Sequence, residues 1–203
     1  MQPDSQFSVP RESLAKLRQY EALLIKWQKA VNLVGPATIP EAWDRHFMDS
    51  IQLTPMVPEN AKVLYDLGSG AGFPGLVLAM TLPGLKVTLI ESDQKKCTFL
   101  MTVSRESSTP VSIVAERIEK VSESLPAPDV VTARALASLG ELFGYIYPWA
   151  QANPALVCIF PKGQLATAEM AEARKIWAFD SRETVSITDP KATILTITNL
   201  SKI

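Results

Sequence analysis

The chain has 203 residues, of which 47% are hydrophobic and 20% are charged, and its formal net charge is −1. This composition predicts a globular protein with a full core, built as one domain or as one domain with an extension. A net charge so close to zero argues against a strongly basic nucleic-acid binder, but it is compatible with a local basic patch.

The apolar runs are all shorter than the ~18 residues that a membrane-spanning helix needs. No basic-then-apolar signal segment opens the sequence, so we expect a cytoplasmic protein. The two cysteines, Cys97 and Cys158, match no metal-ligand spacing and are expected to be small buried apolar side chains. We therefore expect no metal site.

Residues 1–58 are predicted to form a helical extension. Residues 1–10 indicate an irregular lead-in. Apolar side chains then recur every three or four residues, at Leu14, Leu17, Tyr20, Leu24, Trp27 and Val31. This spacing predicts an amphipathic helix. The basic residues off that stripe fit either a solvated helix face or part of an RNA-facing surface.

A second helical stretch is predicted over residues 39–53. It carries Arg45, the only histidine of the chain, His46, and Asp49 three residues later. A lone histidine is usually a structural hydrogen-bonding group. With these charged neighbours, a role in shaping a site is an equally good interpretation. Pro55 and Pro58 mark a boundary, so we divide the chain into an extension, 1–58, and a core, 59–203.

From residue 62 the sequence alternates between strand-like and helix-like segments. The predicted strands cover residues 62–67, 86–91, 111–115, 129–133, 155–160, 184–188 and 192–197. The predicted helices lie near residues 75–82, 95–107, 117–123, 138–149 and 165–178. This alternation predicts right-handed crossovers and a parallel sheet covered on both faces. Only residues 189–191 separate the last two strands, which predicts a terminal antiparallel hairpin.

The segment 62–82 indicates a strand, a tight loop and a helix, with glycines at 68, 70, 72 and 75. Such a loop presents backbone amides and a helix N-terminus to a ligand over the strand end. Residues 70–75 match the dinucleotide fingerprint, and Glu91 follows about 20 residues later. Asp66 argues against a dinucleotide, because its carboxylate would face a pyrophosphate. It suits the ammonium and sulfonium groups of S-adenosylmethionine. A loop that merely turns the chain is the third interpretation.

Ligands of a parallel sheet lie beyond the carboxyl ends of its strands. Glu91, after the second strand, is placed to accept hydrogen bonds from a ribose diol, whereas Asp93 fits better as the cap of the next helix. Residues 116–119 follow the third strand, where they would border an adenine. Arg134 and Lys162 follow the fourth and fifth strands and indicate contacts with an anionic substrate.

Several motifs together resemble one known family. They are Asn32-Leu33, Arg45-His46-x-x-Asp49-Ser50, Asp66-Leu67-Gly68-Ser69-Gly70-Ala71-Gly72-Phe73-Pro74-Gly75, Arg134-Ala135-x-Ala137-Ser138-Leu139 and Lys162-Gly163. From about residue 14 to the C-terminus, the chain resembles the bacterial small-subunit ribosomal RNA guanine-N7 methyltransferases, also called glucose-inhibited division protein B. The resemblance implies a Rossmann-like domain with an N-terminal helical extension, and S-adenosylmethionine as the methyl donor. It implies a guanine in the decoding-region loop of 16S rRNA as the acceptor.

The resemblance places the family's cofactor positions on Gly68, Phe73, Ile118, Glu119 and Arg134. The other residues of the two sets below come from the glycine loop, the strand ends and the segment around His46. The predicted cofactor-binding set is Asp66, Gly68, Ser69, Gly70, Gly72, Phe73, Glu91, Ile118, Glu119 and Arg134. The predicted RNA-binding set is Arg45, His46 and Lys162. Guanine N7 carries a lone pair and no proton, so its attack needs no general base and catalysis can rest on alignment. No single catalytic residue is therefore identified, and Arg134 and His46 are the candidates.

We therefore predict a monomeric Rossmann-like α/β methyltransferase with a seven-stranded, mostly parallel sheet, a C-terminal antiparallel hairpin and an N-terminal helical extension. Its partner would be 16S rRNA or the small ribosomal subunit. Three alternatives stay open: a methyltransferase with another substrate, an NAD-binding oxidoreductase, and a catalytically silent nucleotide-binding regulator.

Overall fold

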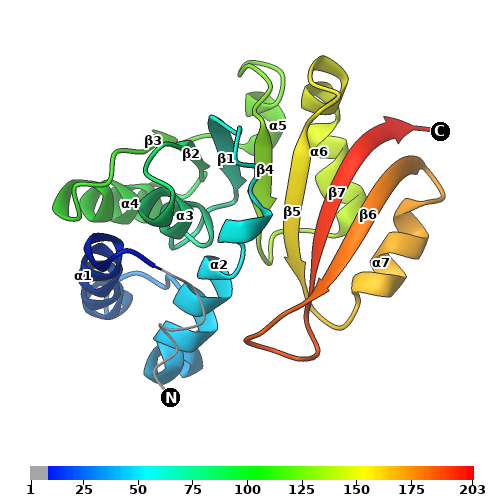
Figure 1. Ribbon diagram of the computed structural model, residues 1–203. Coiled ribbons are helices and arrows are strands. Elements are labelled where there is room, and N and C mark those ends of the chain that lie inside the picture. Colours follow the sequence, from blue (N-terminus) through cyan, green and yellow to red (C-terminus); the bar gives the residue numbers. More distant parts are fainter. Residues whose placement is uncertain (1–8) are drawn as a thin grey trace.

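The computed structural model describes residues 9–203, and residues 1–8 of the expected lead-in lie outside the described part. A seven-stranded sheet with the order β3-β2-β1-β4-β5-β7-β6 runs through the molecule (Figure 1). The strands are β1 (Val63–Leu67), β2 (Lys86–Ile90), β3 (Ser112–Val114), β4 (Val130–Ala133), β5 (Val157–Lys162), β6 (Trp177–Val185) and β7 (Thr193–Lys202). The pairs among β1 to β5 are parallel, and β7 is antiparallel to both β5 and β6. The predicted fold class is thereby confirmed.

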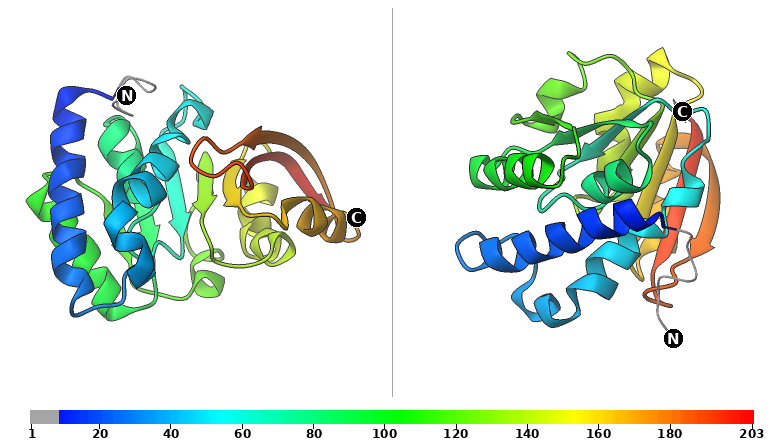
Figure 2. Two further views of the ribbon diagram at one scale, coloured as in Figure 1. Left: turned by 90° about the horizontal axis from the view of Figure 1, so that it is seen from below. Right: turned by 60° about the vertical axis from the view of Figure 1, so that its left-hand side comes forward.

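Helices cover both faces of the sheet (Figures 1 and 2). The main ones are α1 (Arg11–Gln28), α3 (Gly75–Thr81), α4 (Gln94–Glu106), α5 (Ile118–Val121), α6 (Leu139–Ala152) and α7 (Ala166–Ala173). The core on one face joins α1, α3 and α4 to the sheet, and the core on the other face joins α5, α6 and α7 to it. Because β1 is covered on both sides, Leu64 lies in the first core and Leu67 in the second.

The stretch expected as one helix over 39–53 is irregular. It consists of a 3-10 helix, η2 (Pro36–Glu41), a π-helix, η3 (Trp43–Met48), a short α2 (Asp49–Ile51) and a 3-10 turn, η4 (Thr54–Met56). Pro40 contributes to this in the first part, since it lies inside η2 and lacks the N–H that a regular α-helix would use there. Seen from below, this helical segment lies between α1 and the loop that joins β6 to β7 (Figure 2, left).

The terminal hairpin is longer than expected. The helix predicted over 165–178 ends at Ala173, and β6 already begins at Trp177. Trp177 and Phe179 are buried and alternate with exposed Ala178 and Asp180, which is a strand pattern. The connecting loop covers residues 186–192. It lies at the carboxyl edge of the sheet, where the arrowhead of β5 points down in Figure 1.

Both cysteines are buried and free, and each is 1% exposed. Burial raises the pKa of the Cys158 thiol, and burial followed by the nearby Glu91 charge raises that of Cys97. Within residues 9–203 we find no group of acidic, histidine and cysteine side chains that could hold a metal ion. None of the helices described is long and apolar enough to cross a membrane.

Candidate active site

Three cavities lie side by side at the carboxyl edge of the sheet, and Ala135 lines all of them. The Glu91 cavity, of about 320 Å³, lies between Glu91 and residues 116–119. The Phe73 cavity, of about 430 Å³, is lined by the glycine loop, Phe73 and His46. The Asp189 cavity, of about 330 Å³, lies between Arg134, the end of β5 and the β6–β7 loop. They form one continuous cleft, as expected for a doubly wound sheet.

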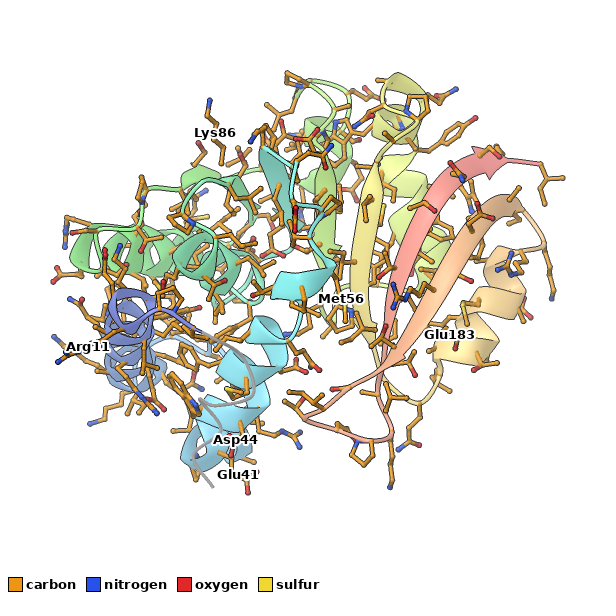
Figure 3. The ribbon with its side chains drawn as sticks, in the orientation of Figure 1. Arg11, Glu41, Asp44, Met56, Lys86 and Glu183 are labelled. Carbon is orange, nitrogen blue, oxygen red and sulfur yellow. The ribbon has the colours of Figure 1, made fainter. Side chains whose placement is uncertain are left out.

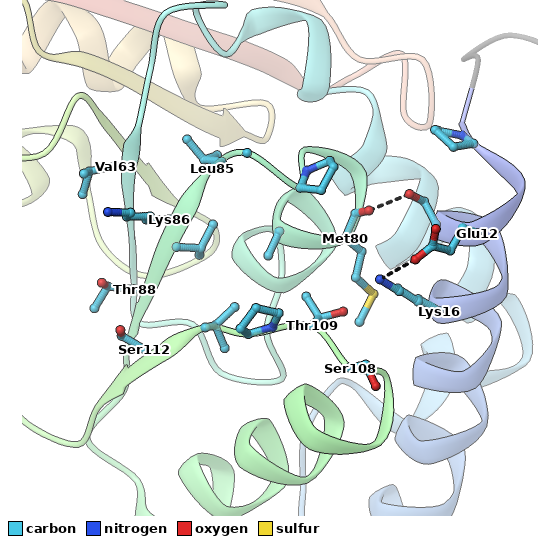
Figure 4. A pocket seen from close by; sticks show the side chains of 18 of the residues that line it. Glu12, Lys16, Val63, Met80, Leu85, Lys86, Thr88, Ser108, Thr109 and Ser112 are labelled. Carbon is cyan, nitrogen blue, oxygen red and sulfur yellow. Dashed lines mark hydrogen bonds and ion pairs between the residues drawn. The ribbon is translucent and has the colours of Figure 1, made fainter.

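A larger cavity, of about 730 Å³, lies at the opposite edge, among the amino ends of β2 and β3 (Figure 4). Lys86, which begins β2, lies at the upper edge of the molecule in Figure 3, whereas Asp44 of η3 lies at the lower one. The Lys16 ammonium is paired with Glu12 at 3.0 Å, so that charge is neutralised. None of the predicted site residues lines this cavity. We therefore place the site at the carboxyl edge.

The glycine loop has a backbone conformation that residues with side chains rarely adopt. Gly68, Gly70 and Gly72 have φ angles of +59°, +56° and +97°, values that L-residues rarely adopt. A Cβ on Gly68 would lie 2.6 Å from a methyl of Leu136, and one on Gly72 would lie 2.7 Å from the Tyr20 hydroxyl. The loop is therefore clamped between the chain that leaves β4 and helix α1. The Ser69 hydroxyl donates to the Asp66 carbonyl at 2.9 Å, within the loop.

The structure corrects the role of Asp66. Its side chain is fully buried and lines none of the three cavities at the carboxyl edge. One carboxylate oxygen accepts from the Thr132 hydroxyl at 2.7 Å, and the other has no partner among the described residues. A Cβ on Gly75 would lie 2.6 Å from the Asp66 Cβ, so helix α3 closes over the carboxylate. Burial raises the pKa of Asp66 to about 6. Asp66 supports the loop from below rather than facing a ligand.

Glu91 and Asp93 have different roles: Asp93 caps a helix, as the sequence predicts, and Glu91 lines a cavity. The Asp93 carboxylate accepts from the backbone N–H groups of Lys95 and Lys96 at 2.8 and 3.1 Å, which confirms it as the cap of α4. Glu91 lines the Glu91 cavity, and its two oxygens accept from the N–H groups of Gly70 and Asp93, each at 2.8 Å. Each carboxylate oxygen has a second acceptor position. Glu91 therefore fixes the glycine loop and keeps acceptor capacity for a ligand.

Arg134 is the centre of the polar network in the cleft. Its guanidinium donates to Asp49 Oδ2 at 3.0 Å and to His46 Nδ1 at 3.2 Å, and it lies 5.0 Å from the centre of the Phe73 ring. Phe73 in turn stacks between Tyr20 and His46, with ring centres 5.2 Å apart on each side. The Tyr20 hydroxyl donates to the Ala71 carbonyl. The first helix, the glycine loop and the helical segment 36–51 thus meet at one aromatic stack.

His46 is held neutral in one tautomer. Because Nδ1 accepts from Arg134, Nε2 carries the proton and donates to the Thr38 hydroxyl at 2.8 Å, and that hydroxyl donates to the Gly35 carbonyl. Burial, then the adjacent Arg134 charge, lowers the pKa of His46 to about 4. Both ring nitrogens are engaged. His46 therefore positions Arg134 and is not available as a general base.

The predicted RNA-facing residues lie along the same cleft. Arg45 and Arg134 line both the Asp189 and the Phe73 cavities, whereas Lys162 lines only the first and His46 only the second. The Lys162 ammonium donates to the Ala137 carbonyl at 2.7 Å and to Glu169 at 2.8 Å, and its side chain is only 10% exposed. Direct phosphate binding by Lys162 is therefore not supported by this geometry. Arg45 is exposed and forms no ion pair with the described carboxylates.

Sequence reasoning missed the residues that fasten the β6–β7 loop. Asp49 Oδ1 accepts from the Thr188 hydroxyl at 2.8 Å, while its other oxygen binds Arg134. The buried Gln52 accepts from the Ile187 N–H at 2.9 Å and donates to the Ser186 hydroxyl at 3.0 Å. The spacing of Asp49 from His46 pointed to this helical segment. Nothing in the sequence pointed to a contact with a loop more than 130 residues away.

The strand order, the glycine loop after β1 and the carboxylate after β2 define a Rossmann-like methyltransferase fold. Solved structures support this. A ribosomal protein L11 methylase from Lactobacillus delbrueckii subsp. bulgaricus matches with a TM-score of 0.60 at 13% identity, over 74% of this chain and 76% of that one. An rRNA methylase from Streptococcus thermophilus matches with a TM-score of 0.54 at 9% identity, over 74% and 93% of the two chains.

Residues 13–198 match the family described as rRNA small subunit methyltransferase G, and the chain belongs to that family. Ribosomal RNA small subunit methyltransferase G of Parvibaculum lavamentivorans is 45% identical over 196 residues, which are 95% of this chain and 86% of the relative. The protein of the same name from Paramagnetospirillum magneticum is 45% identical over 194 residues, covering 96% and 92%. The suspected family is thereby confirmed.

Proposed function

We propose that this protein transfers the methyl group of S-adenosylmethionine to N7 of a guanine in the decoding-region loop of 16S rRNA. The observation that carries the proposal is the continuous cleft at the carboxyl edge of a methyltransferase fold, in which cofactor-type and acceptor-type cavities meet at Ala135. Membership of the rRNA small subunit methyltransferase G family supports the ribosomal acceptor.

The residues of the Glu91 and Phe73 cavities fit S-adenosylmethionine. Glu91 has acceptor capacity left for a ribose diol, and Ile118 and Glu119 line the far side of its cavity, where they would border the adenine. The backbone of Gly68, Ser69 and Gly70 lines the Phe73 cavity, where it would approach the amino-acid part. When bound, the cofactor supplies an electrophilic methyl group on a sulfonium.

The chain's own contribution to the chemistry is alignment. Guanine N7 has a free lone pair and loses no proton when it is methylated, so no base is required. His46, the only histidine, holds Arg134 instead of taking a proton. Arg134, which lines both the Phe73 and the Asp189 cavities, is the side chain placed between cofactor and acceptor. We assign it the orientation of the two reactants.

RNA would approach over the exposed side of the Asp189 cavity, where Arg45, which has no ion-pair partner among residues 9–203, offers its guanidinium to a phosphate. We assign Lys162 a structural role in place of the expected contact with RNA. Its bonds to Ala137 and Glu169 tie the chain after β4 to helix α7, and so shape the cavity wall.

The decisive experiment measures transfer of a tritiated methyl group from S-adenosylmethionine to small ribosomal subunits, and separately to naked 16S rRNA, from a strain that lacks this protein. Nucleoside mapping should find 7-methylguanosine in the decoding-region loop. Label in another nucleoside, or none with either substrate, would overturn the proposal. Isothermal titration is the companion measurement: S-adenosylmethionine or its demethylated product should bind, and NAD should not.

A further inference from the structure

The Asp189 cavity combines two internal ion pairs with two unpaired charges of opposite sign. Arg134 is paired with Asp49 at 3.0 Å and Lys162 with Glu169 at 2.8 Å. Neither Arg45 nor Asp189 belongs to an ion pair within residues 9–203, and both are exposed. A ligand of this cavity therefore meets one free guanidinium and one free carboxylate. Such a pair matches a ligand with an anionic group and a set of N–H donors.

Asp189 is fixed in place, although it lies in a loop. Its Oδ1 accepts from the Lys191 N–H at 2.9 Å, and its backbone carbonyl accepts from the Ala192 N–H at 2.9 Å. The preceding Thr188 is fastened to Asp49 by its hydroxyl. Within the described chain Oδ2 has no hydrogen-bond donor, and Oδ1, which holds the turn, keeps a second acceptor position, so both oxygens can accept from a ligand.

Among the RNA bases, guanine alone presents two adjacent donors on its Watson–Crick edge, N1–H and the N2 amine. Adenine and cytosine place an acceptor beside their amine, and uracil places carbonyl oxygens beside its single N–H. A carboxylate accepts from two adjacent donors and repels the acceptors of the other bases. Guanine N7 lies across the ring from this edge. A guanine held by its Watson–Crick edge at the β6–β7 loop would therefore turn N7 towards Ala135 and Arg134, where the cofactor cavities begin.

We infer that the Asp189 cavity is the acceptor pocket, in which Asp189 selects guanine through its N1–H and N2 amine while Arg45 holds an RNA phosphate. The inference rests on the proposed function and adds to it the residue that chooses the base. It also requires that the target nucleotide leave its stack, as bases do when an enzyme acts on them.

The test compares guanosine with inosine, which keeps N1–H and N7 but lacks the N2 amine, at the target position of 16S rRNA assembled by ligation. Each RNA is used naked and reconstituted into subunits, with the full-length protein and S-adenosylmethionine. Loss of one hydrogen bond to a carboxylate should lower kcat/KM for inosine about tenfold in the wild type. No inosine penalty in the wild type overturns the inference.

Asp189→Asn is the informative variant, because the amide oxygen can still accept from Lys191 while an NH₂ group replaces the free oxygen. It should lower kcat/KM on guanosine about tenfold and abolish the preference for guanosine over inosine. Asp180→Asn is the matched control: it removes the same charge from β6, where the Asp180 carboxylate accepts from the Asn199 side chain and lines none of the three cavities of the cleft. It should leave both values unchanged.

Unchanged activity of Asp189→Asn on guanosine, or an undiminished inosine penalty in that variant, refutes the assignment. Cofactor affinity and the urea unfolding midpoint of Asp189→Asn should equal those of the wild type, which separates base selection from misfolding. A wild-type protein that methylates no guanosine N7 at all would instead defeat the proposed function itself.

Discussion

At the scale of single residues, two neighbouring carboxylates should separate cofactor binding from folding. Glu91→Ala removes an acceptor of the Glu91 cavity together with its bond to Gly70, and we expect S-adenosylmethionine binding to weaken by roughly 1–3 kcal/mol. Asp93→Ala removes only the cap of α4, and should lower the free energy of unfolding with a smaller effect on binding. Isothermal titration and urea unfolding measure the two quantities. Equal losses of affinity would show that Glu91 does not hold the ribose.

His46 predicts a pH dependence of stability. Its pKa is about 4 in the folded protein and 6.5 in the unfolded chain, so the unfolded state binds the proton first as the pH falls. The stability contributed by neutral His46 is therefore complete above pH 6.5 and is lost towards pH 4, by up to roughly 3 kcal/mol. Urea unfolding of the wild type and of His46→Gln between pH 4.5 and 7.5 should show their difference in stability changing through this window. A constant difference would contradict the assigned neutral tautomer.

Residue roles were predictable where the backbone dictates them. Asp93 follows a strand and precedes a helix, which determines a cap. Asp66 was misassigned because its side chain lies on the face of β1 that α3 covers. The sequence does not reveal that Gly75, which has no side chain, allows this helix to pack directly on the carboxylate. Lys162 is paired because Glu169, on helix α7, lies next to it. No local sequence pattern predicts that contact between two different elements.

At the scale of elements, helix α1 should act on the cofactor site through one hydroxyl. Tyr20→Phe leaves the ring stacked on Phe73 but deprives the buried Ala71 carbonyl of its donor. We expect a loss of roughly 1–3 kcal/mol of folding free energy and weaker S-adenosylmethionine binding, because the glycine loop loses a tether.

Tyr147→Phe is the control for this prediction. Tyr147 packs on Trp177 in the opposite core, and among the described contacts its hydroxyl makes no hydrogen bond. Both its stability and its cofactor affinity should stay at wild-type values. Undiminished affinity in Tyr20→Phe would show that α1 supports only the fold.

The elements themselves were largely predictable, because parallel strands between helices give a strong alternation of apolar and amphipathic segments. The two failures have physical causes. The segment after Gly35 carries prolines and is shaped by tertiary contacts, so it forms 3-10 and π turns instead of one helix. The start of β6 was hidden because Met170, Ala173 and Trp177 recur at helical spacing, so Trp177 also fits the end of a longer α7. In the structure Trp177 and Phe179 both pack on Phe143 as alternate residues of a strand.

At the scale of the whole molecule, a chain of net charge −1 binds RNA in this proposal through local cations, of which Arg45 forms no ion pair within residues 9–203. Arg45→Ala should flatten the dependence of log K on log salt by about one counterion. Lys162→Ala should leave that slope unchanged and instead destabilise the protein, because Glu169 loses its partner. Lys202→Ala, an exposed charge at the end of β7, is the control for a general change of charge. The same slope change in all three variants would contradict a specific role for Arg45.

The burial of both cysteines has a practical consequence. Thiol reagents meet no accessible sulfur in the folded protein, since Cys97 and Cys158 are each 1% exposed and have raised pKa values. A single cysteine introduced at an exposed site, such as Arg182→Cys on β6, would therefore carry a cleavage probe or fluorophore without removal of the native thiols. Radical footprints from such a probe would test the proposed RNA partner directly, by giving the orientation of the protein on 16S rRNA or on the small ribosomal subunit, nucleotide by nucleotide.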